Sequence, residues 1–109
     1  MELLLTEKDL KKTLGLPIAV IFKHSHRCPI SAKAKNSVIS SEESNPDCPF
    51  FMVDVIDQKD LSGKIASLFS IPHESPQVFL LAKGIVIWNA SHFDISKKSL
   101  NDSIAALME

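Results

Sequence analysis

A continuous apolar segment, Ile18-Ala19-Val20-Ile21-Phe22, constrains the fold of this chain more than any other feature. Pro17 precedes it, and the polar residues His24-Ser25-His26 follow soon after. A short apolar run without alternating polar residues is typical of a strand that is buried on both of its faces. We therefore expect a central strand in a sheet that is covered on both sides.

Helical patterns stand on either side of this strand. Thr6 can cap a first helix, which ends near Gly15 and Pro17. Pro29 suits the first turn of a second helix, where its missing N–H costs nothing, and Ser44-Asn45-Pro46-Asp47 ends that helix. The apolar residues at helical spacing in these two segments are Leu10, Leu14, Ile30, Ala34, Val38 and Ile39.

The rest of the chain continues this alternation and then changes it. Residues 50–55 read as a second strand, and a third helix follows before Pro72. Residues 77–81 and 85–88 are two more strands, and the short link between them indicates a hairpin. Ser96 can cap a last helix. The apolar stripes of the third and last helices are Leu61, Ile65, Leu68, Phe69, Leu100, Ile104 and Leu107.

The order of elements is therefore α-β-α-β-α-β-β-α. Alternating strands and helices give parallel strands joined by right-handed crossovers, whereas the hairpin adds an antiparallel strand. This is the order of the thioredoxin-like fold. Because no linker, repeat or low-complexity segment divides the chain, we expect one α/β domain over residues 1–109, with a four-stranded mixed sheet flanked by helices.

Composition limits the partners and the compartment. With a formal net charge of -1 and 23% charged residues, nothing indicates nucleic-acid binding or disorder. The apolar run in the first eight residues is far too short for a signal peptide or a membrane span, so we expect a cytoplasmic protein with no membrane partner. Two cysteines, Cys28 and Cys48, are too few for a secreted disulfide scaffold and indicate catalytic, redox or buried roles.

Cys28 stands where the central strand gives way to the second helix, in His26-Arg27-Cys28-Pro29-Ile30-Ser31. Unpaired N–H groups and the positive end of the helix dipole favour a thiolate there. A thiolate can attack a disulfide sulfur and form a mixed disulfide. Ser31 occupies the place of the second cysteine of a dithiol motif, so it can donate a hydrogen bond but cannot close a disulfide. The pattern predicts Cys28 as nucleophile, aided by Ser31, in an exchange that an outside thiol completes.

Pro76 follows Ser75 and opens the third strand. In thioredoxin-like proteins a cis-proline at this topological position lies opposite the active cysteine, and the backbone of Ser75 would be free to pair with an extended substrate. Arg27 could pair with a carboxylate of a small thiol. The residues that we expect to contact the substrate are Arg27, Pro29, Ile30, Ser75 and Pro76.

The other reactive side chains give weaker signals. Cys48 is interpreted as a small buried hydrophobe, with a resolving or regulatory thiol as the alternative. His24 and His26 lack the spacing of zinc ligands, so we predict no metal site and expect both to line the loop and favour the thiolate. Three lysines around the cysteine are interpreted as solvated charges, namely Lys23, Lys33 and Lys35.

Three segments carry a family likeness. The first is Lys23-His24-Ser25-His26-Arg27-Cys28-Pro29-Ile30-Ser31-Ala32, around the cysteine. The second is His73-Glu74-Ser75-Pro76-Gln77-Val78-Phe79, and the third is Trp88-Asn89-Ala90-Ser91-His92-Phe93-Asp94-Ile95. They resemble the monothiol bacilliredoxins, the YtxJ-like family linked to bacillithiol. The resemblance implies that Cys28 takes bacillithiol from S-thiolated proteins and that a second thiol or a reductase then regenerates the enzyme, without a cofactor. It also implies that Pro76 is the family's cis-proline.

Arg27 departs from this resemblance, because a small polar residue precedes the cysteine in many relatives. Glutathione, coenzyme A or a protein thiol would be the partner where bacillithiol is not made. Two other functions stay open. One is an iron–sulfur carrier resembling the monothiol glutaredoxins, although that family has Gly-Phe in place of the stiffer Pro29-Ile30. The other is a non-catalytic thioredoxin-like interaction module. We expect a thiol–disulfide oxidoreductase.

Overall fold

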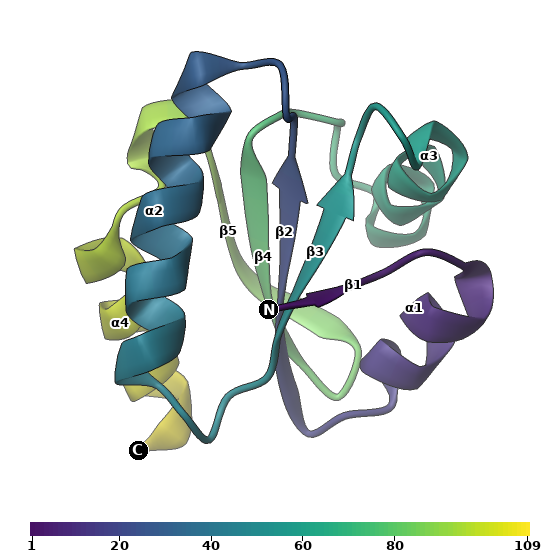
Figure 1. The fold of residues 1–109 in the computed structure, drawn as a ribbon. Helices are drawn as coiled ribbons and strands as arrows, with labels where there is room; N and C mark the ends of the chain where they lie inside the picture. The colour runs from purple at the N-terminus through teal and green to yellow at the C-terminus, as the bar shows by residue number, and fades with distance from the viewer.

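A computed structural model describes residues 1–109 as one twisted sheet with helices on both faces (Figure 1). The strands lie in the order β1-β3-β2-β4-β5. β1, β3 and β2 run parallel, whereas β4 is antiparallel to β2 and β5 is antiparallel to β4. The elements are β1 (Glu2–Leu3), α1 (Glu7–Leu14), β2 (Ile18–His24), α2 (Pro29–Ser44), β3 (Phe50–Asp54), α3 (Lys59–Phe69), β4 (Gln77–Ala82), β5 (Ile85–Ser91), the 3-10 turn η1 (His92–Asp94) and α4 (Lys97–Met108).

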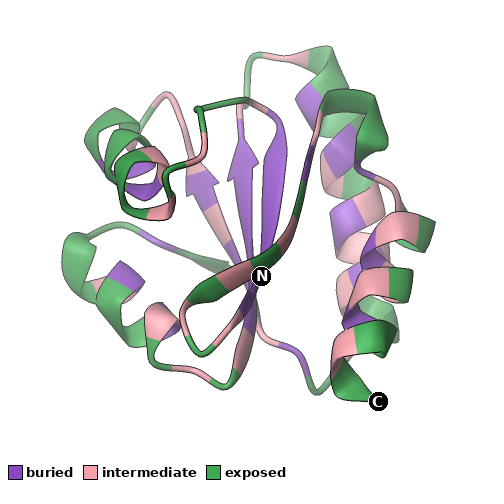
Figure 2. Cartoon of the chain, turned by 180° about the vertical axis from the view of Figure 1, so that it is seen from behind, coloured by how far each residue is buried: buried purple, intermediate pink, exposed green.

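β2 divides the interior into two cores, because successive side chains of a strand point to opposite faces. Val20 and Phe22 pack with α2 and α4, whereas Ala19 and Ile21 pack with α1 and α3. Figure 2 shows this burial concentrated in the middle of the sheet and on the inner faces of the helices. The predicted central strand and the thioredoxin-like fold are confirmed. No helix combines the length and the apolar character needed to cross a membrane.

The helices begin close to where the sequence predicts. Thr6 caps α1 and forms a capping box with Asp9, and α1 ends at Gly15. Ser96 caps α4. The stripe predicted for α2 is wrong at its start, because Ile30 is 38% exposed while the neighbouring Ser31 is buried. The first turn of α2 buries a hydroxyl rather than an apolar side chain.

A tight hairpin joins β4 to β5. Lys83 and Gly84 both have positive φ, 49° and 79°, as a two-residue type I′ turn requires. A Cβ at Gly84 would lie 2.8 Å from the carbonyl oxygen of Leu14, at the end of α1. The turn therefore needs glycine both for its backbone conformation and for the approach of α1.

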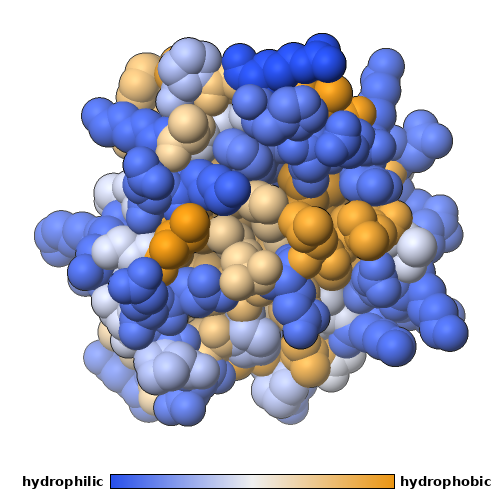
Figure 3. Space-filling view, viewed as in Figure 1, coloured by the Kyte–Doolittle hydropathy of each residue, from blue (hydrophilic) through white to orange (hydrophobic).

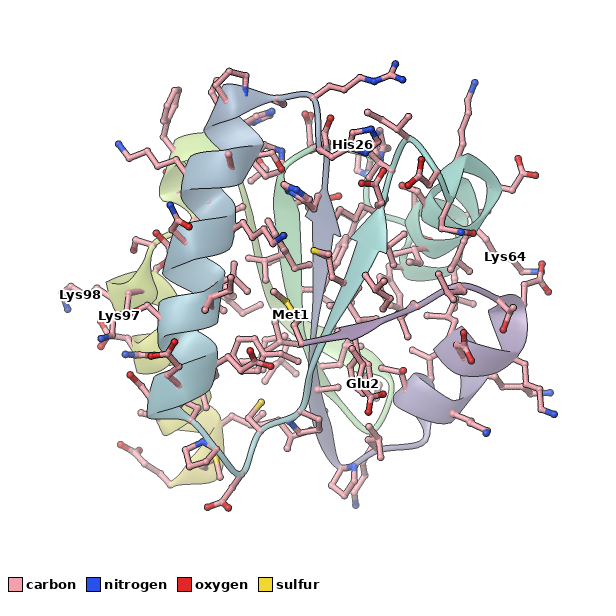
Figure 4. The ribbon with its side chains drawn as sticks, in the orientation of Figure 1. Met1, Glu2, His26, Lys64, Lys97 and Lys98 are labelled. Carbon is pink, nitrogen blue, oxygen red and sulfur yellow. The ribbon has the colours of Figure 1, made fainter.

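β1 is a fifth strand, so the predicted four-stranded sheet is wrong by one edge strand. Glu2 and Leu3 pair with β3, and the N–H of Leu4 donates to the carbonyl of Met52 at 2.8 Å. The amino group of Met1 forms an ion pair with Glu42 of α2 at 2.9 Å, and Figure 4 shows Met1 beside that helix. Periodicity cannot reveal a strand of two residues that tertiary contacts hold in place.

Lys23 also departs from expectation, because its side chain is fully buried. β2 continues two residues beyond the apolar run, and the pleat turns Lys23 toward α3. Its Nζ donates to the carbonyl of Ser62 at 2.9 Å, lies 3.1 Å from Nδ1 of His73 and stands 5.8 Å from the ring centre of Phe79. None of the ion pairs in the structure includes Lys23. Burial lowers the pKa of Lys23 to about 8.

Lys23→Met should raise the free energy of unfolding near neutral pH by about 1–3 kcal/mol, because it removes a buried charge that no carboxylate offsets. Below pH 8 the amine is protonated in both the folded and the unfolded state, so the folded state is destabilised by the full free energy of burying its charge. Between about 8 and the ordinary pKa of 10.5 the folded state loses its proton first, so the wild type recovers stability and the difference shrinks.

Urea denaturation of both proteins at about pH 7 and pH 10 measures this difference. Lys33→Met, at an exposed position of α2, is the matched control and should show no such pH dependence. A Lys23→Met protein less stable than the wild type at neutral pH would contradict the prediction.

Candidate active site

Cys28 is the N-cap residue of α2 and is partly buried. Its carbonyl accepts the first hydrogen bond of the helix from Ala32 at 3.0 Å, and its own N–H donates to the carbonyl of Ser25 at 3.2 Å. Pro29 has no N–H, and those of Ile30 and Ser31 have no partner in the structure. The start of α2 therefore offers two free backbone donors and the positive end of its dipole near Cys28, which is the environment that favours a thiolate.

Ser31 is fully buried, and its hydroxyl is engaged by the end of β2. The N–H of Ser25 donates to Oγ at 2.9 Å, and Nδ1 of His24 lies 2.7 Å from the same oxygen. No hydrogen bond joins Ser31 to the sulfur of Cys28, so the contact expected between them is not formed in this arrangement. Ser31 instead ties the first turn of α2 to the strand and the loop before it.

The two histidines play different structural parts, contrary to the expectation that both line the loop. His24 is the last residue of β2, is only 6% exposed and lies 5.7 Å from the ring of Phe22. Burial chiefly lowers the pKa of His24; the charge of Lys35 lowers it further, and Asp54 opposes the shift. His26 is exposed in the loop, at the end of the sheet where α2 begins (Figure 4).

His26 anchors the loop to β3. Its Nδ1 lies 2.7 Å from Oδ2 of Asp54, whose other oxygen accepts the N–H groups of Ile56 and Asp57. Burial raises the pKa of Asp54, but these hydrogen bonds outweigh it and leave that pKa below its ordinary value. Potential ligand atoms of His26, Asp54 and Asp57 lie within 4.8 Å of one another. Hydrogen bonds to Asp54 from the ring of His26 and from the backbone N–H of Asp57 join these three residues and hold the loop against β3.

The segment before β4 lies beside this loop. Gln77 pairs with Lys23 near the end of β2, which places the preceding Ser75 and Pro76 past that end. The bond between Ser75 and Pro76 is cis, and the carbonyl of Pro76 accepts the N–H of His92 at 3.0 Å. The N–H and carbonyl of Ser75 have no partner, and its Oγ is the one buried side-chain oxygen or nitrogen without a hydrogen bond. Ser75 thus keeps its polar groups free near the loop that carries Cys28.

Arg27, Pro29 and Ile30 are exposed around Cys28. In the face that Figure 3 shows, the end of the molecule where α2 begins is mostly hydrophilic. Phe93 of η1 is an exception that sequence reasoning missed, with 77% of its surface exposed. η1 contacts α2, and it follows directly on β5, the strand that pairs with β4. A single aromatic in a polar segment has no periodicity, so no pattern could single it out.

Cys48 is separated from this site by the length of α2. Cys28 precedes the helix and Cys48 follows it, and 16 residues of helix span roughly 24 Å. Cys48 is only 3% exposed, and burial raises its pKa to about 11. The interpretation as a buried hydrophobe fits these facts, whereas the alternative of a resolving thiol for Cys28 does not.

Comparisons with known proteins agree with this geometry. A solved structure described as a candidate oxidoreductase with a thioredoxin fold is 30% identical, with a TM-score of 0.89 over 94% of this chain and 92% of that one. The fold alone is shared with a Fasciola hepatica thioredoxin (18% identity, TM-score 0.79, 97% and 98% covered). It is also shared with a mutant thioredoxin from Halobacterium salinarum (16% identity, TM-score 0.81, 99% and 90% covered).

The family model of the monothiol bacilliredoxin BrxC matches residues 4–100, which is most of the chain. This match and the oxidoreductase-like neighbour agree with a partly buried cysteine at a helix start, and they support a redox function that uses thiol chemistry. The segments noted in the sequence around Cys28, before β4 and at the end of β5 all fall within the matched range. The chain belongs to the monothiol bacilliredoxin family.

Proposed function

We propose that this protein removes a low-molecular-weight thiol, bacillithiol first among the candidates, from mixed disulfides of other proteins. Cys28 is the nucleophile and the only cysteine that takes part. The monothiol bacilliredoxin match supports this proposal, as does the unpaired start of α2 around Cys28. The compartment consistent with it is the reducing cytoplasm, where thiols of this kind are kept as reductants.

The exchange has two balanced steps. The thiolate of Cys28 attacks the sulfur of the small thiol, so that a new S–S bond forms and the old S–S bond to the substrate protein breaks. The substrate cysteine leaves as a thiolate and takes a proton from water. A second thiol, from another small molecule or from a reductase, then attacks the small-thiol sulfur, releases Cys28 and carries the disulfide away.

The observation that carries this proposal is the isolation of Cys28 from any other sulfur. Ser31 stands where a resolving cysteine would be, and Cys48 lies at the far end of α2. A dithiol cycle within one chain would need two sulfurs whose Cα atoms approach within about 7 Å. A single reactive cysteine must instead pass its disulfide to an outside thiol.

Substrate binding is proposed along the segment before β4. The free N–H and carbonyl of Ser75 can pair with an extended backbone in the manner of an added strand. Pro76 and the exposed Pro29 and Ile30 would contact the substrate on either side of the disulfide. Arg27 is the cation proposed for a carboxylate of the small thiol, since bidentate guanidinium pairs suit carboxylates.

Incubation with oxidised bacillithiol should add one small-thiol moiety at Cys28, because only this cysteine is accessible and placed at a helix start. Intact mass measures the adduct, and peptide mapping assigns it. Oxidised glutathione and oxidised coenzyme A run in parallel to rank the thiols. If none of the three oxidised thiols forms an adduct and Cys28 is unreactive, the proposal is wrong and a non-catalytic interaction module is indicated.

Two cysteine variants form the matched controls. Cys28→Ser should abolish the adduct and the release of small thiol from an S-thiolated substrate protein. Cys48→Ala should keep both, because that thiol is buried and lies at the opposite end of the sheet. An adduct that persists in Cys28→Ser, or that disappears in Cys48→Ala while the fold is intact, would be incompatible with a single nucleophile.

Arg27→Ala should raise KM for an S-bacillithiolated protein by roughly two- to fivefold without lowering kcat, since an exposed ion pair contributes up to about 1 kcal/mol to binding. Steady-state release of the small thiol at several substrate concentrations measures both constants. Lys33→Ala, another exposed cation near the same helix start, is the control. Equal KM values for Arg27→Ala and the wild type would exclude the pairing.

A further inference from the structure

We propose that His24 is a positioning residue for Cys28. His24 acts through the hydroxyl of Ser31 and passes the proton of the cysteine to solvent. The inference rests on the proposed role of Cys28 as a nucleophile and concerns how its thiol becomes a thiolate. Neither histidine of the loop region has a place in the exchange steps described above. His24 is nevertheless buried, titratable and hydrogen-bonded within the first turn of the helix that Cys28 caps.

The hydroxyl of Ser31 has one proton and two acceptor sites. The N–H of Ser25 fills one acceptor site at 2.9 Å. The contact with Nδ1 of His24 at 2.7 Å can therefore be made in two ways, since either atom can supply the proton. The atom that supplies the proton determines whether Ser31 can donate or can only accept a hydrogen bond with another neighbour.

In the first arrangement the proton of neutral His24 is on Nε2, and the hydroxyl of Ser31 donates to Nδ1. Ser31 then has only a lone pair left for Cys28, which suits an S–H donor and disfavours a thiolate. In the second arrangement His24 carries its proton on Nδ1 and donates to Ser31. Both acceptor sites of Ser31 are then filled, and its own proton is free for the thiolate.

The spacing of Ser31 from Cys28 suits that contact, although the structure does not show it. Cys28 is the N-cap of α2 and Ser31 is three residues on, and residues three apart at a helix start are neighbours. A hydrogen bond from a hydroxyl to a thiolate is charge-assisted and so stronger than a neutral one. The structure holds the hydroxyl in its contacts with Ser25 and His24 and shows no hydrogen bond to the sulfur, so the proposed contact forms only when Cys28 ionises.

His24 can make this change while it stays neutral. The groups that face it are Phe22 on its own strand, Ser31 and Lys35 of α2, Asp54 of β3 and His26 of the loop. Burial and the cation of Lys35 hold the pKa of His24 below its ordinary value despite Asp54, so the imidazolium is disfavoured. Nε2 has no protein partner, yet it is not among the fully buried unpaired atoms. This nitrogen therefore retains contact with solvent.

The proton balance follows from these contacts. Cys28 passes its proton from Sγ to Oγ of Ser31, and Ser31 passes its own proton to Nδ1 of His24. His24 releases the proton of Nε2 to water. The products are a thiolate, a hydroxyl that donates to it, and a neutral histidine with its proton on Nδ1, so that one proton in total enters solvent.

Nitrogen-15 NMR of histidine-labelled protein tests this directly, because ring nitrogen shifts distinguish the two tautomers. His24 should change from the Nε2–H to the Nδ1–H form over the pH range in which Cys28 ionises. Blocking Cys28 with iodoacetamide should abolish that change. His73, which faces Lys23 on the other side of the sheet, is the internal control and should be unaffected by the block.

Alkylation rates of Cys28 with iodoacetamide supply the second readout. Ser31→Ala and His24→Phe should each slow alkylation near neutral pH by about tenfold, the usual scale of one hydrogen bond to a charged group. The double variant should be no slower than either single one. His24→Asn should recover most of the rate, because its amide nitrogen occupies the place of Nδ1 and can donate to Ser31.

The outcomes separate this inference from the proposed function. An unchanged His24 tautomer across the ionisation of Cys28, or His24→Phe protein that is folded and alkylates at the wild-type rate, would overturn the role of His24. The small-thiol adduct at Cys28 would survive that result. Conversely, the tautomer change needs only ionisation of Cys28, so it can be observed even if no small thiol forms an adduct. If His24→Phe does not fold, the alkylation rate of His24→Asn and the NMR measurement still test the role of His24.

Discussion

The hydroxyl of Ser31 holds the parts of the site together. A buried hydroxyl must find hydrogen-bond partners or destabilise the fold by about 1–3 kcal/mol, and this one finds them at the end of β2 and in the following loop. The strand end, the loop and the first turn of α2 are therefore fixed relative to one another. Cys28 lies between the loop and the helix, so its position follows from a contact in which it has no part.

Two consecutive residues at the end of β2 anchor the two segments that frame Cys28. The pleat sends His24 toward α2, where it holds Ser31, and sends Lys23 toward α3, where it bonds His73 just before Ser75 and Pro76. The side chain of Gln77 reinforces the second segment through the carbonyl of Pro72 and the N–H of Glu74. The central strand thus supports the cysteine loop from one face and the Ser75–Pro76 segment from the other.

Apolar patterns were sufficient to predict the fold, because each of the longer elements buries a stripe or a run of its own. They failed for β1, which depends on pairing with β3 and on the ion pair between Met1 and Glu42. They also failed for Lys23, since a cation is expected in solvent unless tertiary structure supplies partners. The places of Cys28 and Ser31 at the start of α2, and of Ser75 just before β4, were predictable from motif and order. The orientation of the Ser31 hydroxyl was not, because it depends on His24, which the sequence presents only as part of a polar loop.

The hairpin at Gly84 shows how a local preference can conceal a long-range constraint. Its positive φ would alone explain a glycine, and asparagine is also common in such turns. The carbonyl of Leu14 excludes that exchange, because any Cβ at this position would press against the end of α1. A helix near the start of the chain therefore restricts which residues a turn near its end can accept. A substitution at position 84 would therefore first displace α1, which lies on the opposite edge of the molecule from Cys28.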